Sequence, residues 1–201
     1  METVRGVGLA LSKTLWRIKF HNVENIPQNL AGGLLVVSNH QTYLDPLWIC
    51  LPIHRKFRFM AWDKSFEWFL VGKLIRYLGA FPVNLERGAP ETLRRSLKAL
   101  RAGATLVIFP EGAREFSDGQ MLEFKNGAVK IAMHAGVSVL PVTIRGGHRV
   151  WAQDMRLPRL GKVEVFYHPP LPIPPPSPGA DERAHVAELT DRLEGIIKSK
   201  M

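Results

Sequence analysis

The sequence predicts a single α/β domain with a mostly parallel mixed sheet flanked by helices and preceded by an amphipathic helix. Three observations lead to this fold class. Short, continuously apolar runs at 34–38 and 105–109 are typical of strands that are buried on both faces, as parallel strands are. Segments with helical periodicity separate these runs, and this alternation favours a parallel sheet. The length of 201 residues suits one domain with a substantial core.

Composition and charge narrow the class of protein. Hydrophobic residues make up 46% of the chain, which excludes a disordered protein, and the single cysteine, Cys50, excludes an internal disulfide and favours a reducing compartment. The formal net charge of +9 calls for an anionic partner, which nucleic acid, a lipid headgroup surface or a phosphorylated substrate would each provide. No uncharged apolar run reaches the ~18 residues of a transmembrane helix, and no secretory cleavage site follows the apolar N-terminal part, so we do not expect a secreted protein.

Residues 1–21 are predicted to form an amphipathic segment that associates with a membrane. Apolar residues recur at helical spacing on one side of a helix expected over 3–20, namely Val4, Leu11, Leu15 and Ile18. Basic residues fall towards the other side, namely Arg5, Lys13 and Arg17. A basic amphipathic helix can lie in a membrane interface, and it can equally pack on its own domain.

Residues 22–201 are predicted to hold the sheet and its helices. Strands are expected at 34–38, 54–60, 80–83, 105–109, 137–144 and 162–167, and the last alternates polar and apolar residues as the edge of a sheet does. Helices are expected at 46–52, 64–78, 90–102, 124–135 and 180–199, the last of them capped by Asp181. Prolines are dense at 169–178, which predicts an extended spacer without donors for a sheet.

The stretch Asn-His-Gln-Thr-Tyr-Leu-Asp at 39–45 follows the strand at 34–38, at the sheet edge where open α/β folds bind ligands. Pro46 favours a helix start at this point and predicts that Asp45 caps the helix. The loop is long enough for Asp45 to accept a hydrogen bond from one imidazole nitrogen of His40, which leaves the other nitrogen to take a proton. The pair would then be a general base with its orienting group. The alternative is a satisfied polar histidine beside an ordinary helix cap.

A second polar block, Pro-Glu-Gly-Ala-Arg-Glu at 110–115, follows the strand at 105–109 and is expected at the same edge of the sheet. Gly112 lets the backbone approach a ligand closely, and Arg114 offers a planar guanidinium suited to phosphate. Lys125, a little further along the chain, either adds positive field for an anionic ligand or lies on a solvated face.

Together these blocks resemble the glycerolipid acyltransferases, and in particular the 1-acyl-sn-glycerol-3-phosphate acyltransferases. Three of the four sequence blocks of that family occur in its order, at 39–45, 109–114 and 139–142. A lone His-x-x-x-x-Asp is weak, but its combination with Phe-Pro-Glu-Gly-x-Arg is specific. The resemblance runs from about residue 22 to 197 and implies the glycerol-3-phosphate acyltransferase-like fold.

The resemblance implies an O-acyltransferase of phospholipid biosynthesis that moves a fatty acyl chain from acyl-CoA or acyl-ACP to the free hydroxyl of 1-acylglycerol-3-phosphate and so forms phosphatidic acid. His40 would be the catalytic base and Asp45 its partner. The block at 110–115 would handle the glycerol phosphate of the acceptor through Glu111, Gly112 and Arg114, and Pro141 would belong to the acyl-donor side. We expect backbone N–H groups near the helix start at Asp45 to stabilise the oxyanion.

The resemblance also implies what the protein would not need. Acyl transfer from a thioester requires a base, but no metal, no enzyme nucleophile and no cofactor besides the acyl donor. The chain indeed has no Gly-x-Ser-x-Gly elbow, no Walker A loop and no Cys or His cluster with zinc spacing. The expected partners are the lysophospholipid, the acyl donor and the membrane surface, without nucleic acid. The expected location is peripheral, on the cytoplasmic side of the cell membrane.

One block departs from the family pattern. The fourth block usually reads Gly-x-x-x-x-x-Arg, and here 79–84 fits but Leu85 stands at the position of the arginine. Arg87 comes two residues after Leu85, so in an extended strand its side chain would point to the same side, and it would reach a phosphate if the loop bulges. The acceptor therefore stays open, with another lysophospholipid or a lyso-aminolipid as the alternative. Outside the enzyme class, the alternative is a non-catalytic protein that binds anionic lipid or nucleic acid through its basic surface.

Overall fold

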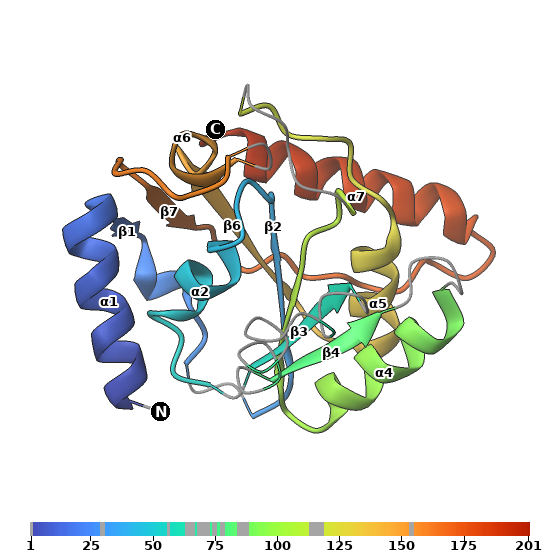
Figure 1. Cartoon of the computed structure of the whole chain (residues 1–201). Coiled ribbons are helices and arrows are strands. Elements are labelled where there is room, and N and C mark those ends of the chain that lie inside the picture. The colour runs from blue at the N-terminus through green and yellow to red at the C-terminus, as the bar shows by residue number, and fades with distance from the viewer. Residues whose placement is uncertain are drawn as a thin grey trace.

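A seven-stranded sheet forms the middle layer of the computed structural model (Figure 1). The structure describes residues 2–28, 31–55, 57–62, 67, 73, 76, 79–83, 89–112, 119–152 and 155–201. The strands are β1 (Lys19–His21), β2 (Leu34–Ser38), β3 (Phe57–Trp62), β4 (Ala80–Val83), β5 (Thr105–Ile108), β6 (Val139–Arg145) and β7 (Glu164–Tyr167). Their order across the sheet is β1-β7-β6-β2-β5-β3-β4, and only β7 against β6 is antiparallel. The predicted mostly parallel mixed sheet is confirmed.

Helices cover both faces of the sheet, α1 and α2 on one face and α4, α5 and α7 on the other (Figure 1). Their bounds are α1 (Glu2–Trp16), α2 (Asp45–Cys50), α4 (Ala89–Arg101), α5 (Gly127–Ala135), α6 (His148–Trp151) and α7 (Glu182–Lys198), with a short 3₁₀ turn η1 (Val23–Asn25). The central strand β2 sends alternate side chains into the two cores, Leu34 and Val36 into one and Leu35 and Val37 into the other. All four are fully buried, which explains the unbroken apolar run. The helix expected over 64–78 falls largely outside the described residues.

The N-terminal segment differs from the prediction at its C-terminal end. The helix ends at Trp16 rather than near Phe20, because Arg17 adopts a left-handed backbone conformation with φ +42°. Trp16 is buried, and its indole nitrogen donates to the carbonyl oxygen of Arg159 at 3.1 Å. Lys19–His21 then form β1, which pairs in parallel with β7. The expectation that the strand near 162–167 lies at the sheet edge is therefore wrong, since β1 occupies that edge.

Helix α1 both packs on the domain and leaves an apolar stripe in solvent. Gly8 and Ser12 lie on the packed side with Trp16, and a Cβ at Gly8 would come within 3.2 Å of the Leu51 side chain. The stripe consists of Val7, Leu11 and Leu15, which are 56%, 52% and 37% exposed. Within the described residues, no helix is long and apolar enough to cross a membrane.

The C-terminal part lies against the domain along its length. The proline-rich residues 169–178 do supply a sheet donor, contrary to the prediction, because the amide of Leu171 donates to the carbonyl of Val139 at 2.7 Å and the reverse bond measures 2.9 Å. The carboxylate of Asp181 accepts from the amide of Arg183 at 2.8 Å, so the predicted helix cap is confirmed. Helix α7 then packs on β6 and α5.

Candidate active site

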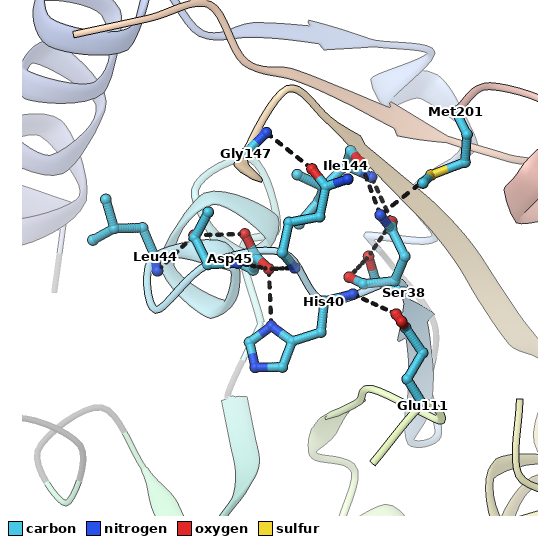
Figure 2. A network of polar contacts seen from close by, with 11 residues as sticks. Ser38, His40, Leu44, Asp45, Glu111, Ile144, Gly147 and Met201 are labelled. Carbon is cyan, nitrogen blue, oxygen red and sulfur yellow. Dashed lines mark hydrogen bonds and ion pairs between the residues drawn. The ribbon is translucent and has the colours of Figure 1, made fainter. Parts of the chain in front are cut away.

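The two polar blocks meet at the carboxyl edge of the sheet because the strands that deliver them, β2 and β5, are neighbours. The contact is direct, since the backbone amide of His40 donates to Oε1 of Glu111 at 2.7 Å (Figure 2). The prediction that both blocks reach one edge is thereby confirmed.

The carboxylate of Asp45 is the centre of the loop at 39–44. Its Oδ2 accepts from His40 Nδ1 at 2.8 Å and from the amides of Gln41 and Thr42 at 2.6 and 2.8 Å (Figure 2). Its Oδ1 accepts from the hydroxyl of Thr42 at 2.7 Å. The residue is fully buried, and these four donors offset the cost of burying its charge. The predicted contact between His40 and Asp45 is present.

One detail of the sequence interpretation is wrong. Asp45 does not cap α2, because Leu44 is the N-cap residue and the carboxylate of Asp45 turns back to the preceding loop. The physical reason is that four donors of the preceding loop already engage the Asp45 carboxylate, while Pro46 at the helix start has no N–H to offer it. The amides of Gln41 and Thr42 are engaged by Asp45, and that of Leu44 by the Thr42 hydroxyl at 2.9 Å, so an oxyanion site at the helix start stays a prediction for other amides.

The imidazole of His40 is held on one side and open on the other. Its ring stacks on Phe109 with centroids 4.0 Å apart and planes 17° apart. Because a carboxylate only accepts, Nδ1 carries the hydrogen of the bond to Asp45 and the lone pair lies on Nε2. Within the described part of the chain Nε2 makes no hydrogen bond, and the side chain keeps 17% of its surface exposed. This nitrogen can therefore take a proton from a bound ligand.

Glu111 lies behind His40 and is only 3% exposed. Its second oxygen, Oε2, accepts from the amide of Leu122 at 2.8 Å, so each of its two oxygens is engaged by a backbone N–H. Burial raises the pKa of Glu111 to about 7 and outweighs the two amide bonds, which lower it. The geometry gives Glu111 a part in fixing the main chain at His40, and its predicted contact with an acceptor stays a prediction.

The raised pKa of Glu111 makes stability depend on pH. The folded protein binds a proton there between about pH 4.5 and pH 7 that the unfolded chain has released, so stability falls as the pH rises through this window. We expect the wild type to lose about 2 to 3 kcal/mol of unfolding free energy between about pH 5 and pH 8, relative to Glu111→Gln. Urea unfolding of both proteins at the two pH values measures this difference. If the free energy of unfolding changed equally with pH in both proteins, the raised pKa of Glu111 would be contradicted.

The other predicted binding residues fall into three groups. Gly112 has φ +72°, and Lys125 lies across it, with Nζ 2.6 Å from where a Cβ would stand, so both are beside Glu111. Pro141 is buried in the middle of β6, opposite Val37 of β2, and is part of the sheet rather than of the loop cluster. The remaining two, Arg87 and Arg114, lie outside the described residues.

Sequence reasoning missed two amide side chains that hold the loop at 39–44. Asn39 accepts from the amide of Ile144 at 2.8 Å and donates to its carbonyl at 2.9 Å, which extends the pairing of β2 with β6 by one step (Figure 2). Gln41 accepts from the amide of Gly147 at 2.9 Å and donates to the carbonyl of Gly119 at 3.3 Å. The sequence did offer one signal for this role, because Asn39 and Gln41 directly flank His40. Among the residues that the structure describes, no group of three or more His, Cys, Asp or Glu side chains could hold a metal ion.

Comparisons with known proteins agree with this arrangement. A family model described as "Acyltransferase" matches residues 17–145. The 1-acyl-sn-glycerol-3-phosphate acyltransferase LPAT1, chloroplastic, of Arabidopsis thaliana is 30% identical over 78% of the chain and 44% of its own length. The 1-acyl-sn-glycerol-3-phosphate acyltransferase of Streptococcus pneumoniae is 33% identical over 66% of the chain and 50% of its own. The chain thus spans about half the length of these curated relatives. The crystal structure of the 1-acyl-sn-glycerophosphate acyltransferase PlsC of Thermotoga maritima superposes with a TM-score of 0.80 at 28% identity, over 99% of this chain and 77% of that one.

Proposed function

Because this chain belongs to the acyltransferase family, we propose that it transfers a fatty acyl chain from a thioester donor to the free hydroxyl of a 1-acylglycerol-3-phosphate. The product is phosphatidic acid, and the donor is acyl-CoA or acyl-ACP. The observation that carries the proposal is the His40–Asp45 pair, 2.8 Å apart, whose outer imidazole nitrogen is open. The names of the relatives from Arabidopsis thaliana and Streptococcus pneumoniae support this acceptor.

The geometry suggests how the chain would catalyse the reaction. An alcohol is a poor nucleophile until its proton begins to leave, and Nε2 of His40 accepts that proton from the acceptor hydroxyl. The oxygen then attacks the thioester carbonyl, the carbon–sulfur bond breaks, and the thiolate leaves and takes the proton back from His40. The buried carboxylate of Asp45 keeps the ring in the required tautomer and stabilises the imidazolium that forms.

Positive charge near His40 would hold the phosphate of the acceptor. Lys125 lies across Gly112, next to the loop that carries His40, and Arg87 and Arg114 are proposed to complete the site. Fixing the phosphate brings the hydroxyl to the base, so the attack becomes effectively intramolecular. Pro141, inside β6, is proposed to shape the acyl-donor side only through the path of its strand.

A direct assay tests the proposal. Purified protein is incubated with a radiolabelled long-chain acyl-CoA or acyl-ACP and lysophosphatidate, and the lipid products are separated. We expect labelled phosphatidic acid with at least one donor. If no labelled lipid forms with either donor over a panel of lysophospholipids and lyso-aminolipids, the chain is instead a non-catalytic lipid-binding member of its family.

Leu85 favours a second candidate acceptor, a lyso-lipid without a phosphomonoester, because a leucine cannot bind phosphate where the family pattern has an arginine. The two acceptors make different predictions for Arg87→Ala. If Arg87 replaces the missing arginine, the variant raises KM for lysophosphatidate by about 10-fold to 100-fold, which corresponds to the loss of a charge-assisted contact. Steady-state kinetics measure this, and Arg94→Ala, on the exposed side of α4, serves as the control. An unchanged KM would favour the acceptor without phosphate.

The protein is also proposed to work as a peripheral protein on the cytoplasmic side of the cell membrane. Its acceptor is a membrane lipid, and α1 presents an apolar stripe to solvent. Residues 1–21 were predicted to bind the membrane, and the exposed stripe of Val7, Leu11 and Leu15 supports that role.

A further inference from the structure

Two leucines in the loop between α6 and β7 are the most exposed large apolar residues of the described chain. Leu157 is 76% exposed and Leu160 is 75% exposed. A single exposed leucine is common on protein surfaces and needs no explanation. Two in one short loop, next to a helix with its own exposed apolar stripe, form a larger apolar surface that calls for a partner.

Backbone contacts join this loop to the C-terminal end of α1. The carbonyl of Arg159 accepts from the indole nitrogen of Trp16 at 3.1 Å, and the amide of Gly161 donates to the carbonyl of Leu15 at 3.4 Å. Figure 1 shows the loop, in orange, above that end of α1. The loop that carries the exposed leucines therefore lies beside the C-terminal end of the α1 stripe. We call these residues together the docking face: Val7, Leu11, Leu15, Leu157 and Leu160.

The two segments that carry the docking face are rich in cations. Segment 155–163 contains three cations and no acidic residue, and the cations are Arg156, Arg159 and Lys162. Segment 3–23 contains four cations and no acidic residue, and these are Arg5, Lys13, Arg17 and Lys19. Apolar side chains bordered by exposed cations are typical of a surface that rests on anionic lipid headgroups.

The same loop is connected to the catalytic loop. The indole nitrogen of Trp151 donates to the carbonyl of Met155 at 3.2 Å, at the start of the described part of the loop. The ring of Trp151 packs on that of Tyr43, with centroids 5.1 Å apart and planes tilted by 54°. Tyr43 belongs to the loop that carries His40 and is 38% exposed. Such half-exposed aromatic rings suit the headgroup level of a bilayer.

We propose that residues 155–162 form a second membrane-docking element, which inserts Leu157 and Leu160 into an anionic phospholipid bilayer beside the stripe of α1. Two separate elements fix the orientation of the domain on the bilayer, which a single helix lying in the interface does not. The Trp151–Tyr43 contact then places the loop that carries His40 against the headgroups. This inference rests on the proposed function, because it assumes that the acceptor is drawn from the bilayer.

Vesicle sedimentation tests the docking element without any need for turnover. The full chain is mixed with vesicles of phosphatidylcholine, with and without phosphatidylglycerol. We expect the wild type to bind the anionic vesicles and the variant Leu157→Asp/Leu160→Asp to bind them about tenfold or more weakly. Since both side chains are mostly in solvent, we expect the variant to keep its circular dichroism spectrum and Tm. Wild-type affinity in this variant would overturn the proposal.

A matched control separates this surface from a general effect of added charge. Val23 is another exposed apolar residue, at 43%, and it lies in η1, at the far end of β1 from the loop. We expect Val23→Asp to bind anionic vesicles like the wild type. An equal loss in this control would mean that net charge rather than the loop governs binding, and would overturn the proposal.

A fluorescent probe locates the insertion. Burial raises the pKa of the Cys50 thiol, so a maleimide dye with an environment-sensitive emission labels an introduced thiol in preference. We expect the dye on Leu160→Cys to shift to the blue with anionic vesicles, and the dye on Val23→Cys to stay unchanged. No shift at 160 on vesicles that bind the protein would overturn the proposal.

The acyl-transfer assay distinguishes a failure of this inference from a failure of the proposed function. With a short-chain lysophosphatidate dissolved as monomers, we expect the double leucine variant to turn over like the wild type. If the wild type shows no transfer with any acceptor, the proposed function fails while the vesicle result still decides the docking element.

Discussion

Substituting His40 by alanine is expected to lower kcat by about a thousandfold, since general-base catalysis contributes a factor of roughly 10² to 10⁴. Among the described residues, no other side chain takes the position of the open Nε2, because Asp45 is buried behind the ring and both oxygens of Glu111 accept amide hydrogens. The KM for the acceptor is expected to change little, because in the proposed mechanism the ring would contact the reacting hydroxyl rather than the phosphate. Initial rates with a radiolabelled acyl thioester measure both constants.

His21 offers a matched control for this variant. Its Nε2 lies 3.0 Å from the carboxylate of Glu164, and its ring stacks on Phe166 with centroids 4.3 Å apart. It thus has the same two local features as His40, a carboxylate partner and a stacked aromatic ring, but it lies in β1 at the sheet edge. We expect His21→Ala to retain wild-type kcat. If His40→Ala turned over like His21→Ala, His40 would not be the base.

Substituting Asp45 by asparagine is expected to lower kcat by about a hundredfold to a thousandfold and also to destabilise the fold. The side-chain amide of asparagine can be oriented in two ways. In the first its NH2 group takes the place of Oδ2 and faces the hydrogen on His40 Nδ1, and in the second its oxygen takes that place and accepts this hydrogen. In the first case the imidazole changes tautomer and Nε2 holds a hydrogen, so it cannot take another. Buried amides of the loop then lose an acceptor, which costs about 2 to 4 kcal/mol of unfolding free energy. Turnover and urea unfolding report the two effects separately.

Thr42→Val separates the two roles of the loop network. The variant removes the hydroxyl that donates to Asp45 Oδ1 at 2.7 Å but leaves the contact between Asp45 and His40. We expect a loss of about 1 to 2 kcal/mol in stability and a change in kcat within about tenfold. If Thr42→Val lowered kcat as much as Asp45→Asn, the loop would act through its shape and not through the carboxylate.

The features that the sequence predicted well are those governed by continuous apolar runs. The short apolar runs of β2 and β5 predicted parallel strands that are buried on both faces. Neighbouring parallel strands end at the same edge of the sheet, so the loops that follow them meet there. The contact between His40 and Asp45 could also be predicted, but for a different reason. Only five residues of loop separate His40 from Pro46, which leaves few other partners for either side chain.

The features that it did not predict depend on tertiary contacts. The strand β1 is three residues long, too short to show a period, and it forms because β7 offers an open edge. The orientation of the Asp45 carboxylate depends on where the amides of residues 41 and 42 lie, which no local propensity determines. The roles of Asn39 and Gln41 likewise depend on residues more than 70 positions away, such as Ile144 and Gly119.

The anchoring of the segment around His40 from both sides has a consequence for turnover. Asn39 ties it to β6 on one flank, and Glu111 ties its main chain to the block after β5 on the other. A proton acceptor tethered to two neighbouring strands has little room to rearrange between one reaction cycle and the next. Under the proposed function, we therefore expect the acyl donor and the lyso-lipid to bind and leave while this loop keeps its conformation.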